Sequence, residues 1–331
     1  MNVAERNYSI VFESQSECEK SDRVVAVTVV TYNSENTVIE TLESIFSQSY
    51  GAGYLELIIA DDCSKDSTVS LINEWLKEFS SRFYSARLLV SNKNYGVSIN
   101  CNLAWKAVSS SKWIKTIAGD DMLSIDCISD NINYINNNSN ARIVFSDAIA
   151  FSHDITDGVI IKNYEDFFQE NKIDNQFKLL INECKILAPT SFISCELLKK
   201  VGYADERYPM IEDYPLWFNL LKNGEKFHYF DKTTVFYRVG DTISQQRNRI
   251  GNLKYLNSLF LFQKECIWPS VATGFFKRID DSIIYYEKSL WIQYFGNERT
   301  KFYNIFHYGL CLIRPYRIKK FLLNFFRKSR S

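Results

Sequence analysis

The feature that most constrains the fold is a regular alternation of strand-like and helix-like segments between residues 24 and 123. Apolar, β-prone runs occupy 24–32, 55–62, 86–91 and 113–118, and amphipathic helical patterns occupy 37–48, 67–79 and 97–108. Such alternation predicts a mostly parallel sheet with right-handed crossovers. Because open sheets of this kind bind ligands beyond the carboxyl ends of their strands, function is expected at those ends.

Composition narrows the class of protein further. The chain has 331 residues, of which 46% are hydrophobic, so it has ample material for a core. Its 39 Lys and Arg balance 39 Asp and Glu, which argues against a nucleic-acid-binding protein. Eight scattered cysteines without a C-x-x-C pair indicate reduced thiols in a cytoplasmic protein, not a zinc site. Without a signal peptide or a spanning apolar run, a soluble or peripheral protein is expected.

Polar residues follow each of the first three predicted strands. Thr31, Tyr32 and Asn33 end the first, 61–64 (DDCS) the second and 92–96 (NKNYG) the third. Each set taken alone fits turn and capping chemistry. Their succession instead indicates one ligand lying across the crevice. No G-x-G-x-x-G or P-loop sequence is present at these ends, which disfavours a dinucleotide fold or a P-loop protein.

The fourth strand, 113–118, leads into the adjacent carboxylates Asp120 and Asp121. Like charges this close repel unless a cation or several donors neutralise them. Oxygen ligands suit Mg²⁺ or Mn²⁺, which also hold the phosphates of a substrate. The pattern therefore indicates a metal-diphosphate site. The alternative is a solvated turn in which Ser124 caps the following helix.

Four segments together resemble the ordered motifs of inverting family 2 glycosyltransferases of GT-A fold. They are 31–33 (TYN), 58–68 (IIADDCSKDST), 94–102 (NYGVSINCN) and 117–123 (IAGDDML). The resemblance covers about residues 24–240. It implies an α/β, GT-A-like fold, in which a mostly parallel central sheet is flanked by helices and followed by a C-terminal helical extension.

The resemblance also implies roles for single residues. The residues expected to bind the donor nucleotide are Thr31, Tyr32, Asn33, Asp61, Asp62, Asn94, Gly96 and Asp120. Asp120 and Asp121 are expected to hold Mn²⁺ or Mg²⁺, and the sequence leaves open which of them ligates the metal. The sequence departs from the family pattern at two positions. Ala118 stands at the usual first Asp of a D-x-D motif, and Cys101 stands in place of an Arg.

A second acidic pair, Glu212 and Asp213, opens a helical pattern whose apolar face is Leu216, Trp217, Leu220 and Leu221. Acids in a first turn complement the helix dipole, so capping alone explains them. The resemblance instead implies a catalytic base, which we assign to Asp213, with Glu212 the weaker candidate. A sugar hydroxyl needs such a carboxylate, because it is a poor nucleophile until its proton is taken.

The segment 226–239 predicts a strand pair that ends at Arg238, and Gly240 stands where related enzymes have a histidine. No histidine is therefore available there as a metal ligand. Arg238 is expected either to neutralise the diphosphate, with Glu212 as further support, or to form a structural ion pair.

From Tyr255 the chain is aromatic and helix-like. Residues 314–331 carry seven basic and no acidic side chains, interleaved with Phe and Leu. This composition is typical of helices on anionic membrane surfaces. A solvated tail or a subunit contact are the alternatives.

The predicted organisation is therefore a polar extension, 1–23, a glycosyltransferase domain, 24–245, and a helical, aromatic-rich and basic region, 246–331. The domain divides into a nucleotide-binding half, 24–123, and an acceptor and catalytic half, 124–245.

The expected function is inverting transfer of a hexosyl or N-acetylhexosaminyl group from a nucleotide sugar, a UDP-sugar, to a hydroxyl of a glycan acceptor on a polyprenyl lipid carrier. By the resemblance, this reaction builds O-antigen, capsule or another surface polysaccharide at the inner face of the cytoplasmic membrane. One rival is a nucleotidyltransferase, which should have a basic Gly-rich loop after the first strand. The other is a non-catalytic nucleotide-sugar-binding or scaffold protein of the same fold.

Overall fold

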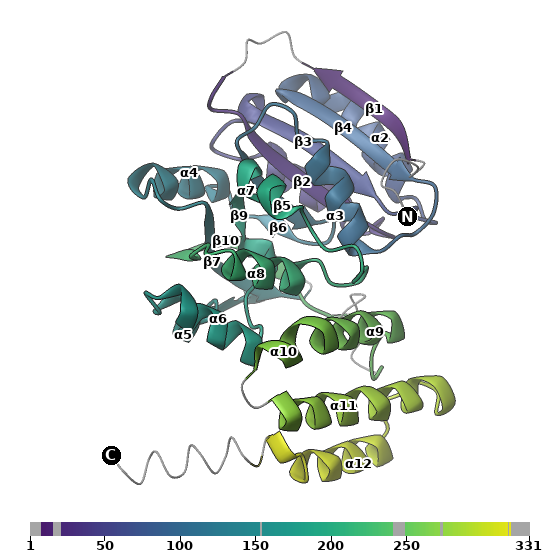
Figure 1. Cartoon of the computed structure of the whole chain (residues 1–331). Helices are drawn as coiled ribbons and strands as arrows, with labels where there is room; N and C mark the ends of the chain where they lie inside the picture. Colours follow the sequence, from purple (N-terminus) through teal and green to yellow (C-terminus); the bar gives the residue numbers. More distant parts are fainter. Residues whose placement is uncertain are drawn as a thin grey trace. The chain divides into compact units, whose positions relative to one another are not determined.

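The computed structural model describes residues 8–15, 21–152, 154–240, 249–271, 274–316 and 318. The chain divides into two compact units, Met1–Arg238 and Val239–Ser331 (Figure 1). The boundary predicted between residues 245 and 246 falls outside the described residues.

Unit 1 is built on a ten-stranded sheet in the order β1-β4-β3-β2-β5-β9-β7-β10-β6, with β8 beside β7. The strands are β1 (Tyr8–Gln15), β2 (Val25–Thr31), β3 (Leu55–Asp61), β4 (Ser85–Ser91), β5 (Trp113–Ala118), β6 (Met122–Leu123), β7 (Ile143–Phe151), β8 (Val159–Ile161), β9 (Phe192–Ser194) and β10 (His228–Arg238). Neighbours among β4, β3, β2 and β5 are parallel, as the alternation predicted. The sheet runs on through both predicted halves of the domain.

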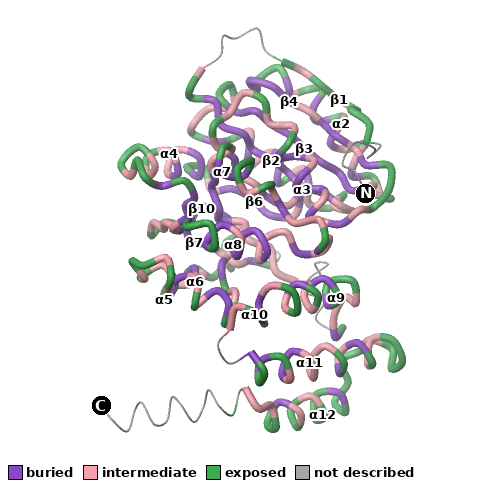
Figure 2. Tube along the Cα trace, in the orientation of Figure 1, coloured by how far each residue is buried: buried purple, intermediate pink, exposed green. Residues whose placement is uncertain are grey.

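Helices cover both faces of the parallel strands. Unit 1 contains α1 (Val38–Phe46), α2 (Thr68–Phe79), α3 (Val97–Lys106), α4 (Cys127–Asn137), α5 (Glu165–Phe168), α6 (Ile173–Asn182), α7 (Cys195–Val201) and α8 (Asp213–Lys222). Side chains of α1, α2 and α4 share one core with one face of the sheet, and those of α3 pack against the other. All seven residues of β3 are consequently buried, which explains its continuous apolar sequence. Figure 2 shows this buried centre.

The polar N-terminal extension contains a strand that the sequence did not reveal. β1 pairs antiparallel with β4, from Tyr8 opposite Ser91 to Gln15 opposite Ser85. Its side chains are mostly exposed, so no apolar alternation marks it. Without β1, β4 would be the edge strand of the sheet. Its free backbone N–H and C=O groups pair with β1 instead.

The strand pair predicted over 226–239 is wrong. The structure has one strand there, β10, which is parallel to β7 and antiparallel to β6. The exposed residues Asp231 and Lys232 resemble a turn in the sequence, but they lie where the register with β7 shifts between Tyr229 and Thr233. An irregular stretch within one strand thus mimics a break between two.

Unit 2 is helical, as predicted for the C-terminal extension. It contains α9 (Leu253–Phe262), a π-helical turn η6 (Gln263–Ile267), α10 (Trp268–Ser270), α11 (Gly274–Tyr294) and α12 (Lys301–Leu312). α9 packs on α11, where the rings of Phe260 and Tyr285 stack with centroids 4.0 Å apart. Most of the basic segment 314–331 lies outside the described residues. Within the described parts of the chain, no helix combines the length and apolarity needed to cross a membrane.

Candidate active site

The carboxyl ends of β2 and β3 lie side by side and are joined through side chains. Thr31 is in register with Asp61, and its Oγ1 donates to Asp61 Oδ2 at 2.9 Å. The Ser64 backbone N–H donates to Asp61 Oδ1 at 2.8 Å, and its hydroxyl donates to Oδ2. The Asp61 carboxylate is fully buried, so it shapes this strand end from within.

The loops after β2 and β3 are fused in the same way. Asn33, in the left-handed region at φ 52°, donates its backbone N–H to Ser64 Oγ at 2.8 Å. Its side-chain Oδ1 accepts a hydrogen bond from the Lys65 N–H at 2.8 Å. Tyr32, which directly precedes Asn33 in the sequence, is half-buried. An Asn tolerates this backbone conformation better than most residues, which fits its place here.

Asp62 links β3 to a distant segment of the chain. Both of its carboxylate oxygens accept backbone hydrogen bonds at 2.8 Å, one from Tyr95 and one from Gly96. Gly96 has φ 95°, and a Cβ there would lie 2.4 Å from the Pro209 carbonyl oxygen. The Ser98 N–H donates to that same oxygen at 3.1 Å. The third strand end therefore packs directly against the segment that leads to Glu212 and Asp213.

The end of β5 packs just as closely on β2. Gly119 donates its N–H to the Val30 carbonyl at 3.0 Å, and its own carbonyl accepts from Thr37 Oγ1 at 2.8 Å. A Cβ at Gly119 would lie 2.6 Å from Thr31 Cγ2. Only a glycine therefore allows this approach, which brings the two following aspartates to the edge of the sheet where β2 and β3 end.

Asp120 and Asp121 have different surroundings. Asp121 is 2% exposed, and its Oδ1 accepts from the Arg238 backbone N–H at 2.8 Å. Arg238 Nε donates to the Asp120 carbonyl oxygen at 2.9 Å. The guanidinium of Arg238 also pairs with Glu40 and lies 4.6 Å from the centroid of the Phe151 ring. Arg238 thus forms the structural ion pair foreseen as one alternative, and its diphosphate role stays a prediction.

Electrostatics favour a cation near this pair. Burial raises the pKa of both carboxyls, that of Asp121 well above its ordinary value with the Asp120 charge adding, while the Arg238 charge lowers both. Within the described part of the chain, no residue except Asp120 itself, through its own backbone, donates a hydrogen bond to the Asp120 carboxylate. A carboxylate that accepts only from its own backbone, beside a second carboxylate, fits Mg²⁺ or Mn²⁺.

The protein side of such a metal site is incomplete. Within the described residues, no group of three or more His, Cys, Asp or Glu is placed to hold a metal ion. Mg²⁺ is usually bound by only one or two carboxylates of the protein, and substrate phosphates and water complete its coordination. The residues present therefore fit a metal that binds together with a phosphorylated ligand.

Glu212 and Asp213 stand at the start of α8. The Tyr214 backbone N–H donates to Asp213 Oδ1 at 2.7 Å, which favours the ionised form of Asp213. Burial, with the charge of Asp213, raises the pKa of Glu212 to about 8, and burial also raises that of Asp213. The two carboxyls therefore compete for a proton.

The charges of three of these acids act on one buried side chain. Burial raises the pKa of the Cys101 thiol, and the charges of Glu212, Asp213 and Asp62 raise it further. Cys101, on α3, is 1% exposed. The loop after β3 and the start of α8 are about 150 residues apart in the sequence, and Gly96 joins them because Asp62 holds its N–H and it packs on Pro209.

Sequence reasoning missed Asn100, which also holds this site together. Its Nδ2 donates to the carbonyls of Ala60 at 2.9 Å and Thr31 at 3.4 Å, so it joins the ends of β2 and β3. Its Oδ1 is buried and has no partner within the described structure. A polar residue with low helix propensity on the buried face of a helix was the available signal.

Most of the predicted site residues meet at one edge of the sheet. The set that hydrogen bonds or direct packing tie together comprises Thr31, Asn33, Asp61, Asp62, Gly96, Asp120, Asp121 and Arg238. Asn94 is exposed on the loop after β4. The seven cysteines within the described residues are free thiols.

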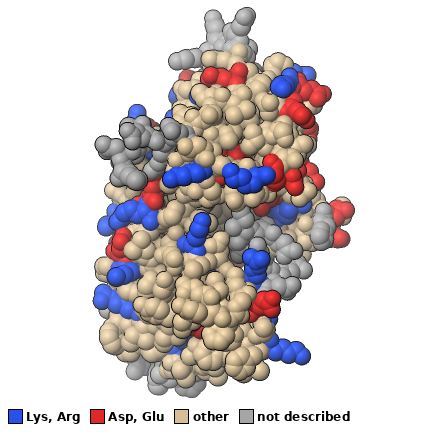
Figure 3. All heavy atoms as spheres, turned by 90° about the vertical axis from the view of Figure 1, so that its right-hand side faces the viewer, with Lys and Arg blue, Asp and Glu red and all other residues tan. Residues whose placement is uncertain are grey.

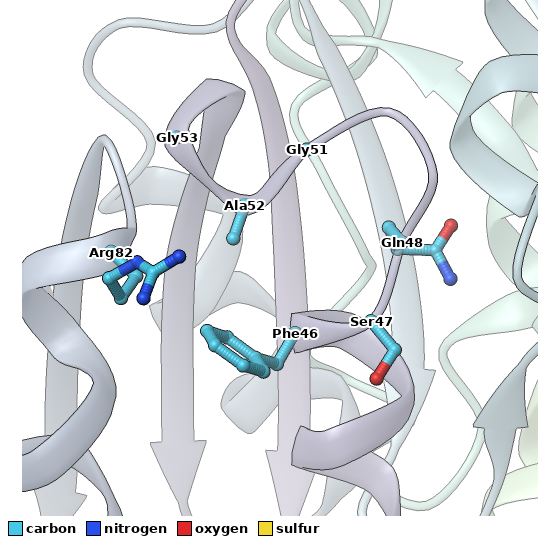
Figure 4. Close-up of a pocket in the computed structure, with 7 residues that line it drawn as sticks. All are labelled: Phe46, Ser47, Gln48, Gly51, Ala52, Gly53 and Arg82. Carbon is cyan, nitrogen blue, oxygen red and sulfur yellow. The ribbon is translucent and has the colours of Figure 1, made fainter.

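A hollow of about 500 Å³ lies away from this edge (Figure 4). It is lined by Phe46, Ser47, Gln48, Gly51, Ala52, Gly53 and Arg82. These residues follow α1 and precede β3 and β4, so they lie at the amino ends of the strands. The predicted site residues belong to the opposite ends. We therefore do not associate this hollow with the acidic residues.

A parallel sheet with acids at its carboxyl edge, extended by antiparallel strands, defines a GT-A-like glycosyltransferase. The sequence model of Glycosyl transferase family 2 matches residues 26–201, more than half of the chain. The chain belongs to this family, which confirms the resemblance and the enzyme class.

Relatives and solved structures agree. The chain is 26% identical over 220 residues to the Escherichia coli UDP-Glc:alpha-D-GlcNAc-diphosphoundecaprenol beta-1,3-glucosyltransferase WfaP, covering 65% of this chain and 77% of WfaP. Staphylococcus aureus TarS 1–349 in complex with UDP-GlcNAc superposes with TM-score 0.56 at 17% identity, over 81% of this chain and 72% of that one. The mannosyltransferase PcManGT from Pyrobaculum calidifontis, with GDP-Man and Mn²⁺, gives TM-score 0.53 at 14% identity, over 81% and 70%. These likenesses confirm the fold class.

Proposed function

We propose that this family 2 glycosyltransferase moves a sugar, with inversion, from a UDP-sugar to a hydroxyl group of a glycan acceptor. The observation that carries the proposal is the meeting of two acidic groups at one sheet edge. Asp62 holds Gly96, which packs on Pro209 just before Glu212 and Asp213, and Asp120 and Asp121 follow β5 next to the end of β2. A base and a diphosphate site are the two elements that a single displacement needs.

In the proposed complex, the donor nucleotide lies across the ends of β2, β3 and β4. Thr31, Tyr32 and Asn33 follow the first of these strands, and Asn94 follows the last. The buried Asp61 and Asp62 act mainly by fixing the loops that contact the donor, because their oxygens are already occupied by Thr31, Ser64, Tyr95 and Gly96. Solved neighbours with UDP-GlcNAc and with GDP-Man support a nucleotide-sugar donor.

Asp120, with Asp121 beside it, would hold Mn²⁺ or Mg²⁺ against the diphosphate. When bound, such an ion neutralises the negative charge that grows on the departing diphosphate. Asp120 is the better ligand of the two, since Asp121 already accepts the Arg238 N–H. The Mn²⁺ in the PcManGT structure supports a divalent cation.

Asp213 would act as the base. Its carboxylate takes the proton from the acceptor hydroxyl while the hydroxyl oxygen forms a bond to the anomeric carbon. The bond from that carbon to the diphosphate oxygen breaks, and its electron pair leaves with UDP. Because the pKa of Glu212 is raised to about 8, Glu212 can hold the shared proton and leave Asp213 ionised. One displacement inverts the anomeric carbon.

The acceptor would be a glycan on a polyprenyl diphosphate, at the inner face of the cytoplasmic membrane. The support comes from relatives, since WfaP is named for a diphosphoundecaprenol acceptor. GgaB of Bacillus subtilis, 23% identical over 238 residues that cover 71% of this chain and 25% of GgaB, is named a minor teichoic acid biosynthesis protein. Both names fit a role in surface polysaccharide synthesis.

Calorimetric titration with a panel of UDP-, GDP- and dTDP-sugars, each with Mn²⁺ and with chelator, tests the proposal. We expect one UDP-sugar to bind in the presence of Mn²⁺ and not in the presence of chelator. Binding of a GDP-sugar alone would overturn the choice of UDP. Donor binding without any transfer or hydrolysis would favour the non-catalytic alternative.

A further inference from the structure

Helices α11 and α12 of unit 2 bury several charged side chains and expose several large apolar ones. On α11, the buried residues include Lys277, Asp280, Asp281 and Glu287. On α12, four large apolar residues are exposed, namely Phe302 at 69%, Ile305 at 72%, Tyr308 at 70% and Leu312 at 78%. We call these four residues the apolar face of α12. Soluble helices normally have the reverse pattern.

Polar contacts fix the rotation of α12 about its own axis. His307 Nδ1 hydrogen bonds to Glu287 Oε2 of α11 at 3.0 Å. Just after the helix, Arg314 Nε donates to Asp280 Oδ2 at 3.2 Å, and the Tyr316 N–H donates to Asp280 Oδ1 at 3.0 Å. These bonds turn His307 and Arg314 toward α11. The opposite side, which carries the apolar face, must then point outward.

Helix α11 also carries exposed apolar side chains. Phe275, Tyr286, Leu290 and Tyr294 are 69%, 59%, 51% and 72% exposed. Figure 2 shows exposed residues along both helices, and at their height the face drawn in Figure 3 is mostly uncharged. An apolar area of this kind marks a binding surface.

Charge identifies the occupant. After Glu298 the chain has no acidic residue, while it has nine Lys and Arg between 299 and 331. A second copy docked on the same face would bring the basic residues at the ends of α12, Arg299, Lys301 and Arg314, toward those of the other copy, which repulsion disfavours. Anionic lipid headgroups above an apolar acyl region match both the charge and the apolar side chains.

We propose that the apolar face of α12 inserts into the surface of an anionic phospholipid bilayer. The helix lies in the interface with Phe302, Ile305 and Leu312 toward the acyl chains and Tyr308 near the headgroups. The inference deepens the proposed function, because a lipid-linked acceptor gives membrane docking its purpose. The docking itself requires neither donor nor acceptor.

The test is co-sedimentation of the full chain with phosphatidylcholine vesicles, with and without phosphatidylglycerol, in the absence of substrates. We expect binding to the phosphatidylglycerol vesicles that weakens as salt increases. Ile305→Asp with Leu312→Asp should weaken it about tenfold or more, because two apolar side chains no longer insert. Asn304→Asp is the matched control for the single variant Ile305→Asp, since each adds one negative charge at an exposed position of α12 and Asn304 lies outside the apolar face. It should retain most of the binding.

Circular dichroism establishes whether the double variant is folded, and Ile305→Ser with Leu312→Ser replaces it if it is not. Absence of binding to anionic vesicles, or equal binding by the double variant, would overturn the proposal. So would a wild-type oligomer that the double variant converts to monomer in sedimentation velocity, because a second copy would then cover the face. Donor titration on the same samples reports the proposed function separately.

Discussion

At the scale of the residue, neighbours in sequence have different tasks. Asp121 accepts a backbone hydrogen bond from Arg238, whereas no other described residue donates to the carboxylate of Asp120. The first thus holds the end of β10, and the second is the one that we propose as the metal ligand. The sequence alone left the two interchangeable.

This difference predicts separable variants. Asp120→Ala should abolish the metal-dependent part of donor binding with little change in stability. Asp121→Ala should lower the free energy of unfolding by about 1–3 kcal/mol, because it removes the acceptor of the partly buried Arg238 N–H. Urea denaturation and calorimetric donor titration with Mn²⁺ measure the two effects. Equal losses of stability in both variants would contradict the division.

Asp213→Asn should reduce the transfer rate by about 10²–10⁴-fold, because the amide cannot take the acceptor proton. Donor binding should remain nearly unchanged, since the change preserves size. The measurement is a rate of product formation alongside a donor titration. Glu212→Gln is the control and should cost less. Full activity of Asp213→Asn would rule out its role as base.

Glu212 should make stability depend on pH. Its pKa rises from 4.5 to about 8 on folding, so the folded chain binds this proton more tightly than the unfolded chain. Glu212 therefore stabilises the folded chain fully below pH 4.5, and this stabilisation is lost as the pH rises toward 8. The free energy of unfolding should therefore decline as the pH rises. Glu212→Gln should make this decline about 1–2 kcal/mol smaller, after allowance for partial exposure and coupling to Asp213.

Urea denaturation of both proteins at pH 5 and pH 8 measures this decline. The exposed Glu196 provides the control Glu196→Gln, which should leave the decline unchanged. Parallel pH dependences of the wild type and Glu212→Gln would show that the side chain is not the cause.

At the scale of the element, the loop after β4 depends on contacts that are remote in sequence. Gly96 lies on Pro209, and Asp62 anchors the loop from the other side. The segment before α8 is thereby placed by a loop more than 100 residues earlier. Helix and strand patterns do not encode such a contact.

Gly96→Ala should therefore destabilise the protein far more than the strain of a positive φ alone would. It combines a positive φ with a contact of 2.4 Å to backbone, and we expect a loss of about 3 kcal/mol or more together with reduced activity. Gly224→Ala is the matched control, because Gly224 has φ 83° and open space around its Cβ. It should cost about 1 kcal/mol. Thermal unfolding and rate measurements distinguish the clash from the strain.

At the scale of the whole molecule, ligand linkage should be visible in unit 1. A UDP-sugar with Mn²⁺ at about 100 times its Kd should add about 2.7 kcal/mol to the free energy of unfolding. Chelator should remove this gain without lowering the stability of the free protein, because the metal binds with the donor. A large destabilisation of the free protein by chelator would indicate a resident structural metal instead.

The sequence by itself determined the parallel strands, the helices between them and the acids at the strand ends. Each of these follows from local periodicity, since a strand buried on both faces must be apolar throughout. It also predicted the family, because four motifs occurred in order. The roles assigned to single site residues stay predictions.

Only the tertiary structure decided which polar atoms remain available. Arg238 meets Asp121 across 117 residues, and Gly96 meets Asp62 across 34. It also added β1 to the sheet edge, joined β10 into one strand and turned the apolar face of α12 outward. These outcomes depend on hydrogen bonds and packing between distant segments, and local pattern carries no record of them because propensity and periodicity report only neighbouring residues.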